Sequence, residues 1–135
     1  MNVSNYINAG MKEEMTLQVE EQHTAAHVGS GSLRVLATPM MIAFMERVAR
    51  DLLARHLPHG YSSVGVHIDV RHLAPTPLGS TVRVQCEVLD VEGSEVNFAV
   101  HAWDSVEQVG DGKHQRVVIN EERFLNRVNA KAALT

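Results

Sequence analysis

The chain has 135 residues, a mass of 14.9 kDa and a formal net charge of -4 at pH 7. Hydrophobic residues make up 44% of it and charged residues 21%, a composition typical of one globular domain and not of a disordered or collagen-like chain. The first 30 residues hold no apolar export segment, and the single cysteine, Cys86, excludes an internal disulfide, so we expect a cytoplasmic protein.

The same composition argues against several classes of partner. No apolar run is long enough to cross a membrane, and the lysines and arginines are scattered, so we expect neither a membrane nor a nucleic-acid partner. The eight histidines form neither an HExxH nor a Cys/His motif, so we expect no metal ion and no other cofactor.

The N-terminal part of the chain predicts a leader and one strand. Residues 1–12 lack hydrophobic periodicity, so we expect a flexible leader followed by a single domain over residues 13–135. From Met15 to Val19 apolar and polar residues alternate, which predicts a half-buried strand. Glycines and small residues then indicate a loop up to Leu36.

A long amphipathic helix is the strongest local signal. Thr38 is an N-cap candidate and Pro39 a favoured first helical residue, and the pattern continues to about Leu57, before Pro58 and Gly60. The expected buried stripe contains Met41, Ile42, Met45, Val48, Ala49, Leu52 and Leu53. After this helix we expect only strands, over about residues 63–72, 82–88, 96–102 and 113–119. One helix on an antiparallel sheet is an α+β fold.

Glu46 interrupts the apolar stripe of the helix. It lies one turn after Ile42 and one turn before Ala49, so the spacing places a carboxylate among core residues. A carboxylate buried for chemistry is one interpretation, because perturbed acids gather at functional sites. The alternative is a Glu46 that reaches solvent or pairs with Arg50 at i+4.

His72 and Gly65 interrupt the strand pattern in the same way. His72 continues the face of Val64, Val66, Ile68 and Val70, so its imidazole is expected to point inward as a proton-transfer group, or else as a hydrogen-bonded core histidine. Gly65 in mid-strand indicates either a local kink or a backbone N–H that faces a ligand. Thr38 is expected to cap the helix, whose N-terminus also suits a developing oxyanion.

Four segments together resemble the fluoroacetyl-CoA thioesterase-like branch of the hotdog-fold thioesterases. They are V-L-A-T-P-M-M-I-A-F-M-E at Val35–Glu46, S-V-G-V-H-I-D-V-R-H at Ser63–His72, the A-P-T-P-L-G turn, and G-x-G-x-H-x-R at Gly110–Arg116. The resemblance implies a hotdog fold, in which a central helix is wrapped by an antiparallel sheet, and a dimer with active sites between subunits. It also implies an acyl-CoA thioester substrate.

The resemblance further implies roles for five residues. Thr38, Glu46 and His72 would be catalytic, Gly65 an oxyanion or acyl contact, and Arg116 a substrate-site contact. Because the segment Gly29–Leu36 has no aromatic residue, we expect a short-chain or aryl acyl-CoA rather than a fluoroacyl substrate. The alternatives are a hotdog dehydratase or hydratase acting on a β-hydroxyacyl thioester, and a non-catalytic acyl-CoA-binding module.

Overall fold

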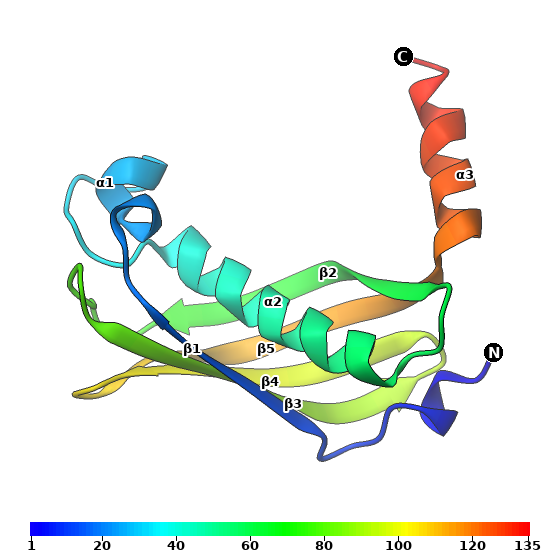
Figure 1. Cartoon of the computed structure of the whole chain (residues 1–135), viewed down its shortest axis with the longest axis horizontal. Helices are drawn as coiled ribbons and strands as arrows, with labels where there is room; N and C mark the ends of the chain where they lie inside the picture. The colour runs from blue at the N-terminus through cyan, green and yellow to red at the C-terminus, as the bar shows by residue number, and fades with distance from the viewer.

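The computed structural model describes residues 1–135 as one sheet with a long helix across one face (Figure 1). The strands are β1 (Lys12–Gln18), β2 (Tyr61–His72), β3 (Thr81–Glu92), β4 (Glu95–Asp104) and β5 (Gln108–Asn120). The helices are α1 (Ala25–Val28), α2 (Thr38–His56) and α3 (Glu121–Ala132), with 3-10 turns at Val3–Asn5 and Glu21–His23. The strand order is β1-β3-β4-β5-β2, and every neighbouring pair is antiparallel.

The core lies between α2 and the inner face of the sheet. The buried stripe of α2 consists of Met41, Phe44, Met45, Val48, Ala49, Leu52 and Leu53, and it packs on alternate residues of β3 and β4. Each fully buried Leu, Met or Val contributes roughly 1.5–3 kcal/mol to stability, so this contact is the main cohesive force of the fold. The predicted α+β architecture, one long helix on an antiparallel sheet, is confirmed.

Two parts of the chain differ from the expectation. Residues 1–12 are not merely a leader, because Val3 and Ile7 are buried in the core. The expectation of strands only after the long helix is wrong, because α3 follows β5 directly and projects away from the sheet (Figure 1). The Asn120 side chain caps α3 by accepting a hydrogen bond from the Arg123 N–H. Asn120 is also the last residue of β5, so this helix-start signal directly follows the strand pattern and was not recognised.

A β-bulge in β2 changes which side chains face the helix. The register with β5 shifts between Gly65 and His67, so Val66 is the extra residue, and it is 52% exposed. The single inward face expected for Val64, Val66, Ile68 and Val70 is therefore wrong at Val66, and also at Val64, because its neighbour Gly65 is the residue that faces Glu46 on α2. A bulge reverses the in–out alternation once, and a pattern of period two cannot show where this happens.

Cys86 on β3 is buried in the core, and its burial raises the pKa of the thiol to about 12.

No helix in the structure combines the length and the apolar character that crossing a lipid bilayer requires.

The tight contact between β5 and β2 at Gly112 provides a test of the fold. A Cβ added at Gly112 would collide with the backbone of Asp69 and Val70 on β2, and its φ of +157° is one that side chains rarely adopt. We therefore expect Gly112→Ala to lower the free energy of unfolding by about 2 kcal/mol or more, measured by urea denaturation. Gly31→Ala, in a surface loop, should change it by less than about 1 kcal/mol, and equal effects of the two variants would contradict the close approach.

Candidate active site

Thr38 and His72 form a polar pair at the N-terminus of α2. The helix begins at Thr38 itself and its N-cap is Ala37, so the prediction that Thr38 caps the helix is wrong. The hydroxyl is used elsewhere: Thr38 Oγ1 lies 2.7 Å from His72 Nδ1 at the end of β2. The first turn of α2 and the last residue of β2, 34 positions apart, thus meet at one hydrogen bond.

The other ring nitrogen of His72 is buried and has no protein partner. Burial also lowers the pKa of His72 below its ordinary value of 6.5, so the imidazole is neutral at pH 7. The His72 side chain lines a pocket of about 340 Å³, together with Ala25, Ser30, Val35, Leu36, Thr38, Leu73, Ala74 and Pro75. A buried ring nitrogen without a partner beside a pocket is a place where a bound molecule would gain a hydrogen bond.

Glu46 lies at the edge of the helix and reaches solvent, as one of its two interpretations expected, but its charged partner is not the expected one. Its side chain is 43% exposed, so it lies at the border of the apolar stripe and not inside it. It does not pair with Arg50 either, because Arg50 bonds its neighbour Asp51 at 2.7 Å. Instead Glu46 Oε2 lies 3.7 Å from Nη1 of Arg116, which reaches it from β5.

Gly65 provides the space for the Glu46 carboxylate. A Cβ at this position would collide with Glu46 Oε2 and would lie 3.2 Å from His114 Cε1. The bulge begins at the same residue, so the kink expected there is confirmed. The carboxylate can lie against the backbone of Gly65 because this residue carries no side chain.

Arg116 is the most deeply buried charge of the protein, with 6% of its surface exposed. Nε donates to Ser63 Oγ at 2.9 Å, Nη2 donates to the Ser63 carbonyl at 3.1 Å, and Nη1 lies 3.3 Å from His114 Nε2. Burial lowers the pKa of Arg116, and the Glu46 carboxylate opposes this shift. Most of the guanidinium is therefore committed to holding β5, β2 and α2 together.

The five predicted residues form two clusters within one chain. One contains Thr38 and His72, and the other contains Glu46, Gly65 and Arg116. Thr38 and Glu46 are eight positions apart on α2, so about 12 Å of helix separates the clusters. The polar residues in contact with a predicted site residue that the sequence did not single out are Ser63 and His114. The motif G-x-G-x-H-x-R held a signal for His114, because alternation on a strand places it on the same face as Arg116.

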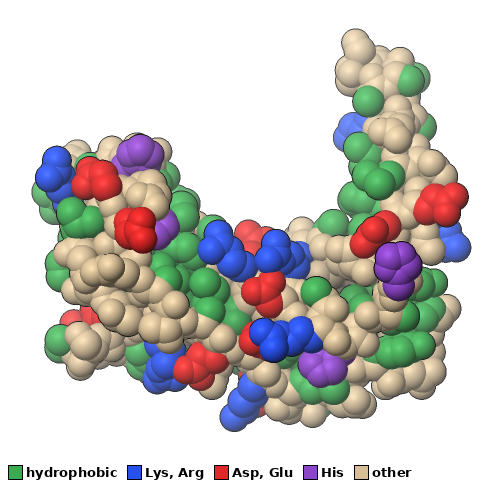
Figure 2. All heavy atoms as spheres, in the orientation of Figure 1, with side chains coloured by type: hydrophobic (Ala, Val, Ile, Leu, Met, Phe, Trp, Pro, Cys, Tyr) green, Lys and Arg blue, Asp and Glu red, His purple; other side chains and the backbone are tan.

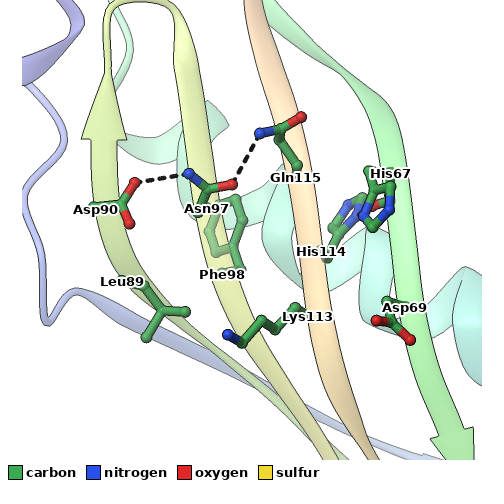
Figure 3. Close-up of a pocket in the computed structure, with 9 residues that line it drawn as sticks. All are labelled: His67, Asp69, Leu89, Asp90, Asn97, Phe98, Lys113, His114 and Gln115. Carbon is green, nitrogen blue, oxygen red and sulfur yellow. Dashed lines mark hydrogen bonds between the residues drawn. The ribbon is translucent and has the colours of Figure 1, made fainter.

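The outer side of the sheet holds none of the predicted residues, whereas the surface over α2 holds Glu46 and Arg116. The largest pocket, about 420 Å³, lies on the outer side of the sheet, where Asp90, Asn97 and Gln115 are linked by hydrogen bonds (Figure 3). On the opposite side, charged side chains gather over the middle of α2, where Arg47 and Arg50 flank Glu46 (Figure 2). No three His, Cys, Asp or Glu side chains lie close enough together to hold a metal ion.

Comparisons with known proteins identify the family. The sequence model of the family described as fluoroacetyl-CoA-specific thioesterase matches residues 19–122. The fluoroacetyl-CoA thioesterase of Streptantibioticus cattleyicolor is 40% identical over 97 residues, which are 72% of this chain and 70% of that protein. A mutant of the fluoroacetyl-CoA-specific thioesterase FlK, solved with fluoroacetate and CoA, is 33% identical with a TM-score of 0.83, over 87% of this chain and 99% of that one.

A second solved structure, a hot-dog-like protein from Thermanaerovibrio acidaminovorans, is 28% identical, with a TM-score of 0.89 over 97% of each chain. The resemblance seen in the four sequence segments is thus confirmed over most of the chain. The chain belongs to the fluoroacetyl-CoA-specific thioesterase family, and it is a thioester hydrolase with the hotdog fold.

Proposed function

We propose that this thioesterase cleaves short-chain or aryl acyl-CoA thioesters to the free acid and CoA, with Thr38, Glu46 and His72 as its catalytic residues. The proposal rests on two groups with fixed orientations. One is the half-exposed carboxylate of Glu46, which Arg116 holds next to Gly65, and the other is the neutral imidazole of His72, which is bonded to Thr38. Thioester hydrolysis requires a carboxylate, a proton-transfer group and oxyanion donors, and these clusters provide each of them.

Each residue has a separate task in this reaction. Glu46 either attacks the thioester carbonyl, forming an acyl anhydride that water then cleaves, or removes a proton from the attacking water. The Gly65 backbone and the N-terminus of α2 stabilise the oxyanion, because a helix start presents free N–H groups and partial positive charge. The His72 imidazole, whose Nε2 has no protein partner, passes a proton to or from the reacting group. The attacking water supplies the proton: the neutral imidazole first accepts it and then gives it to the CoA thiolate, which is the leaving group.

The pocket beside His72 indicates which size of acyl group the enzyme prefers. The pocket of about 340 Å³ is bordered by Ala25, Ser30, Val35, Leu36 and Ala74, which are small or aliphatic. The segment from Gly29 to Leu36 has no aromatic side chain to close it over a two-carbon acyl group. This space favours a larger apolar acyl chain or an aryl ring over fluoroacetate. Arg116, with most of its donors committed inside the protein, contacts the substrate only through the end nearest Glu46.

A homodimer unites the two clusters. β2 is an edge strand of 12 residues that pairs only with β5, and its apolar Val66 is 52% exposed. A long edge strand with exposed apolar residues is a ready template for a second strand. If two copies of β2 pair antiparallel about a two-fold axis between Ile68 and Asp69, the partner subunit's His72 lies opposite Gly65. Two complete sites then form, each with Glu46 from one chain and His72 from the other.

The proposed location is the cytoplasm. Cys86 is buried and has no second cysteine to pair with, as expected of a protein that folds in a reducing compartment.

Replacement of the carboxylate tests the proposed chemistry most directly. Glu46→Gln should reduce kcat by about 10²-fold or more, measured as free thiol release from a panel of acyl-CoAs. The melting temperature should change little, because the ion pair with Arg116 is long, at 3.7 Å, and the Glu46 side chain is only half-buried. Asp51→Asn on the same helix is the matched control and should retain full activity. A fully active Glu46→Gln enzyme would exclude Glu46 from catalysis.

The Thr38–His72 pair predicts a pH dependence. Because burial lowers the pKa of His72, the neutral imidazole persists to pH values below 6.5, and kcat should fall only as the pH drops through that lowered pKa. His72→Ala should reduce kcat by about 10²-fold and remove this titration. Thr38→Val should also lower kcat, whereas Thr38→Ser keeps the hydroxyl and most of the activity. Unchanged turnover of His72→Ala would make His72 a structural residue.

The proposed homodimer is tested by its mass in solution and by a charge placed on β2. Light scattering should give a mass of at least twice 14.9 kDa at micromolar concentration. Val66→Lys places a charge on the free edge of β2, so it should shift the protein to monomers and abolish thiol release. Val106→Lys, at an 85% exposed turn position, is the control and should remain dimeric and active. A fully active monomer would show that one chain completes the site alone.

A further inference from the structure

His114 is a buried histidine next to the proposed site, with 2% of its surface exposed. Its ring stacks on Phe98 of β4 at 6.1 Å between centroids, and its Cε1 faces the space left open by Gly65. Both ring nitrogens have partners: Nδ1 lies 2.8 Å from the His67 carbonyl, and Nε2 lies 3.3 Å from Arg116 Nη1. None of the steps proposed for thioester hydrolysis uses this side chain.

These two partners determine the protonation state of His114. A carbonyl oxygen only accepts, so Nδ1 must carry the proton. A guanidinium only donates, so Nε2 must offer its lone pair to Arg116 Nη1. The geometry therefore requires the neutral imidazole with the proton on Nδ1. Figure 3 shows His114 and His67 side by side on β5 and β2.

The bulge in β2 allows the His67 carbonyl to accept a hydrogen bond from His114 Nδ1. Beside the extra residue Val66, the regular ladder between β2 and β5 is interrupted, and the His67 carbonyl accepts from a side chain of β5. The imidazole is thereby fixed between the backbone of one strand and the guanidinium of Arg116. Arg116 is held in turn by Ser63, so its Nη1 points to Glu46 in one orientation.

We propose that His114 is a positioning residue of the thioesterase: its neutral imidazole orients Arg116 Nη1, which holds the Glu46 carboxylate against Gly65. The proposal rests on the role of Glu46 in the proposed function. It adds a link that runs from the His67 carbonyl through His114 and Arg116 to Glu46. His114 does not touch the substrate, so its effect on the reaction passes through the carboxylate.

Protonation of His114 would break this link. An imidazolium donates from both nitrogens, so it can no longer accept from Arg116, and two cations then lie 3.3 Å apart. The charged groups that face the ring are Glu46 on α2, His67 on β2 and Arg116 on β5, while Phe98 on β4 is neutral. Burial lowers the pKa of His114, and Arg116 lowers it further, so the link is intact at neutral pH and is lost as the pH falls.

Two conservative variants separate positioning from structure. His114→Gln places an amide oxygen where Nε2 was, so it still accepts from Arg116, and kcat at pH 8 should stay within about 3-fold of the wild type. His114→Asn keeps the donor to the His67 carbonyl but is too short to reach Arg116. It should lower kcat by about 10-fold or more, with KM changed by less than about 3-fold. His101→Gln, on the outer face of β4, is the control and should match the wild type.

The pH profile gives a readout that a purely structural role would not move. With His72 and His114 both titrating, log kcat of the wild type should fall at acid pH with a slope approaching 2, and His114→Gln should reduce that slope by one. Equal losses in His114→Gln and His114→Asn, or an unchanged slope in His114→Gln, would overturn the proposal. If the His114 variants resemble the wild type while Glu46→Gln is inactive, the positioning role fails and the proposed function stands.

A spectroscopic test does not depend on catalytic activity. Nitrogen NMR of the labelled wild-type protein, with His114→Gln used for assignment, should show His114 as the neutral ring protonated at Nδ1 at pH 7. Its titration should have a midpoint below 6.5. A ring protonated at Nε2, or a charged ring at pH 7, would contradict the link to Arg116.

Discussion

The buried guanidinium of Arg116 constrains the site more than any other group. A charge held at 6% exposure is tolerated only when its donors are satisfied, because an unpaired buried ion costs several kcal/mol. Ser63, His114 and Glu46 meet this demand from three different elements. The bulge in β2 and the missing side chain at Gly65 follow from it, since they bring the backbone and the carboxylate within reach.

The sequence predicted the elements that depend on local periodicity. The helix expected from Pro39 to about Leu57 is Thr38–His56; the last four strands contain their expected segments, and β1 ends at Gln18, one residue before the expected Val19. These succeed because each apolar stripe needs a partner surface, and its period reveals the type of element. α3 was missed because its short apolar face remains largely exposed, with Leu125 at 55%, so no clear inward stripe marks it.

Predictions about individual side chains were weaker, for a physical reason. The hydroxyl of Thr38 was assigned to its own helix but bonds His72, 34 residues away. The carboxylate of Glu46 was expected either in the core or at the helix edge, reaching solvent or Arg50; it lies at the edge, but it pairs with Arg116, 70 residues away. Local spacing fixes the direction of a side chain within its element, whereas its partner depends on the packing of distant elements. The G-x-G-x-H-x-R motif does indicate one pair of partners, because alternation along a strand places His114 and Arg116 on the same face.

The burial of Cys86 has a practical consequence for the enzymology of this protein. It is the only cysteine, it lies under α2 on the inner face of β3, and its thiol has a pKa of about 12. Disulfide exchange needs an accessible thiolate, so the folded enzyme contributes no background to an aromatic disulfide reagent that reacts with liberated CoA. In the absence of substrate, the slow reaction of the same reagent with Cys86 reports the opening of the core. One colorimetric reagent thus measures turnover in one experiment and global unfolding in the other.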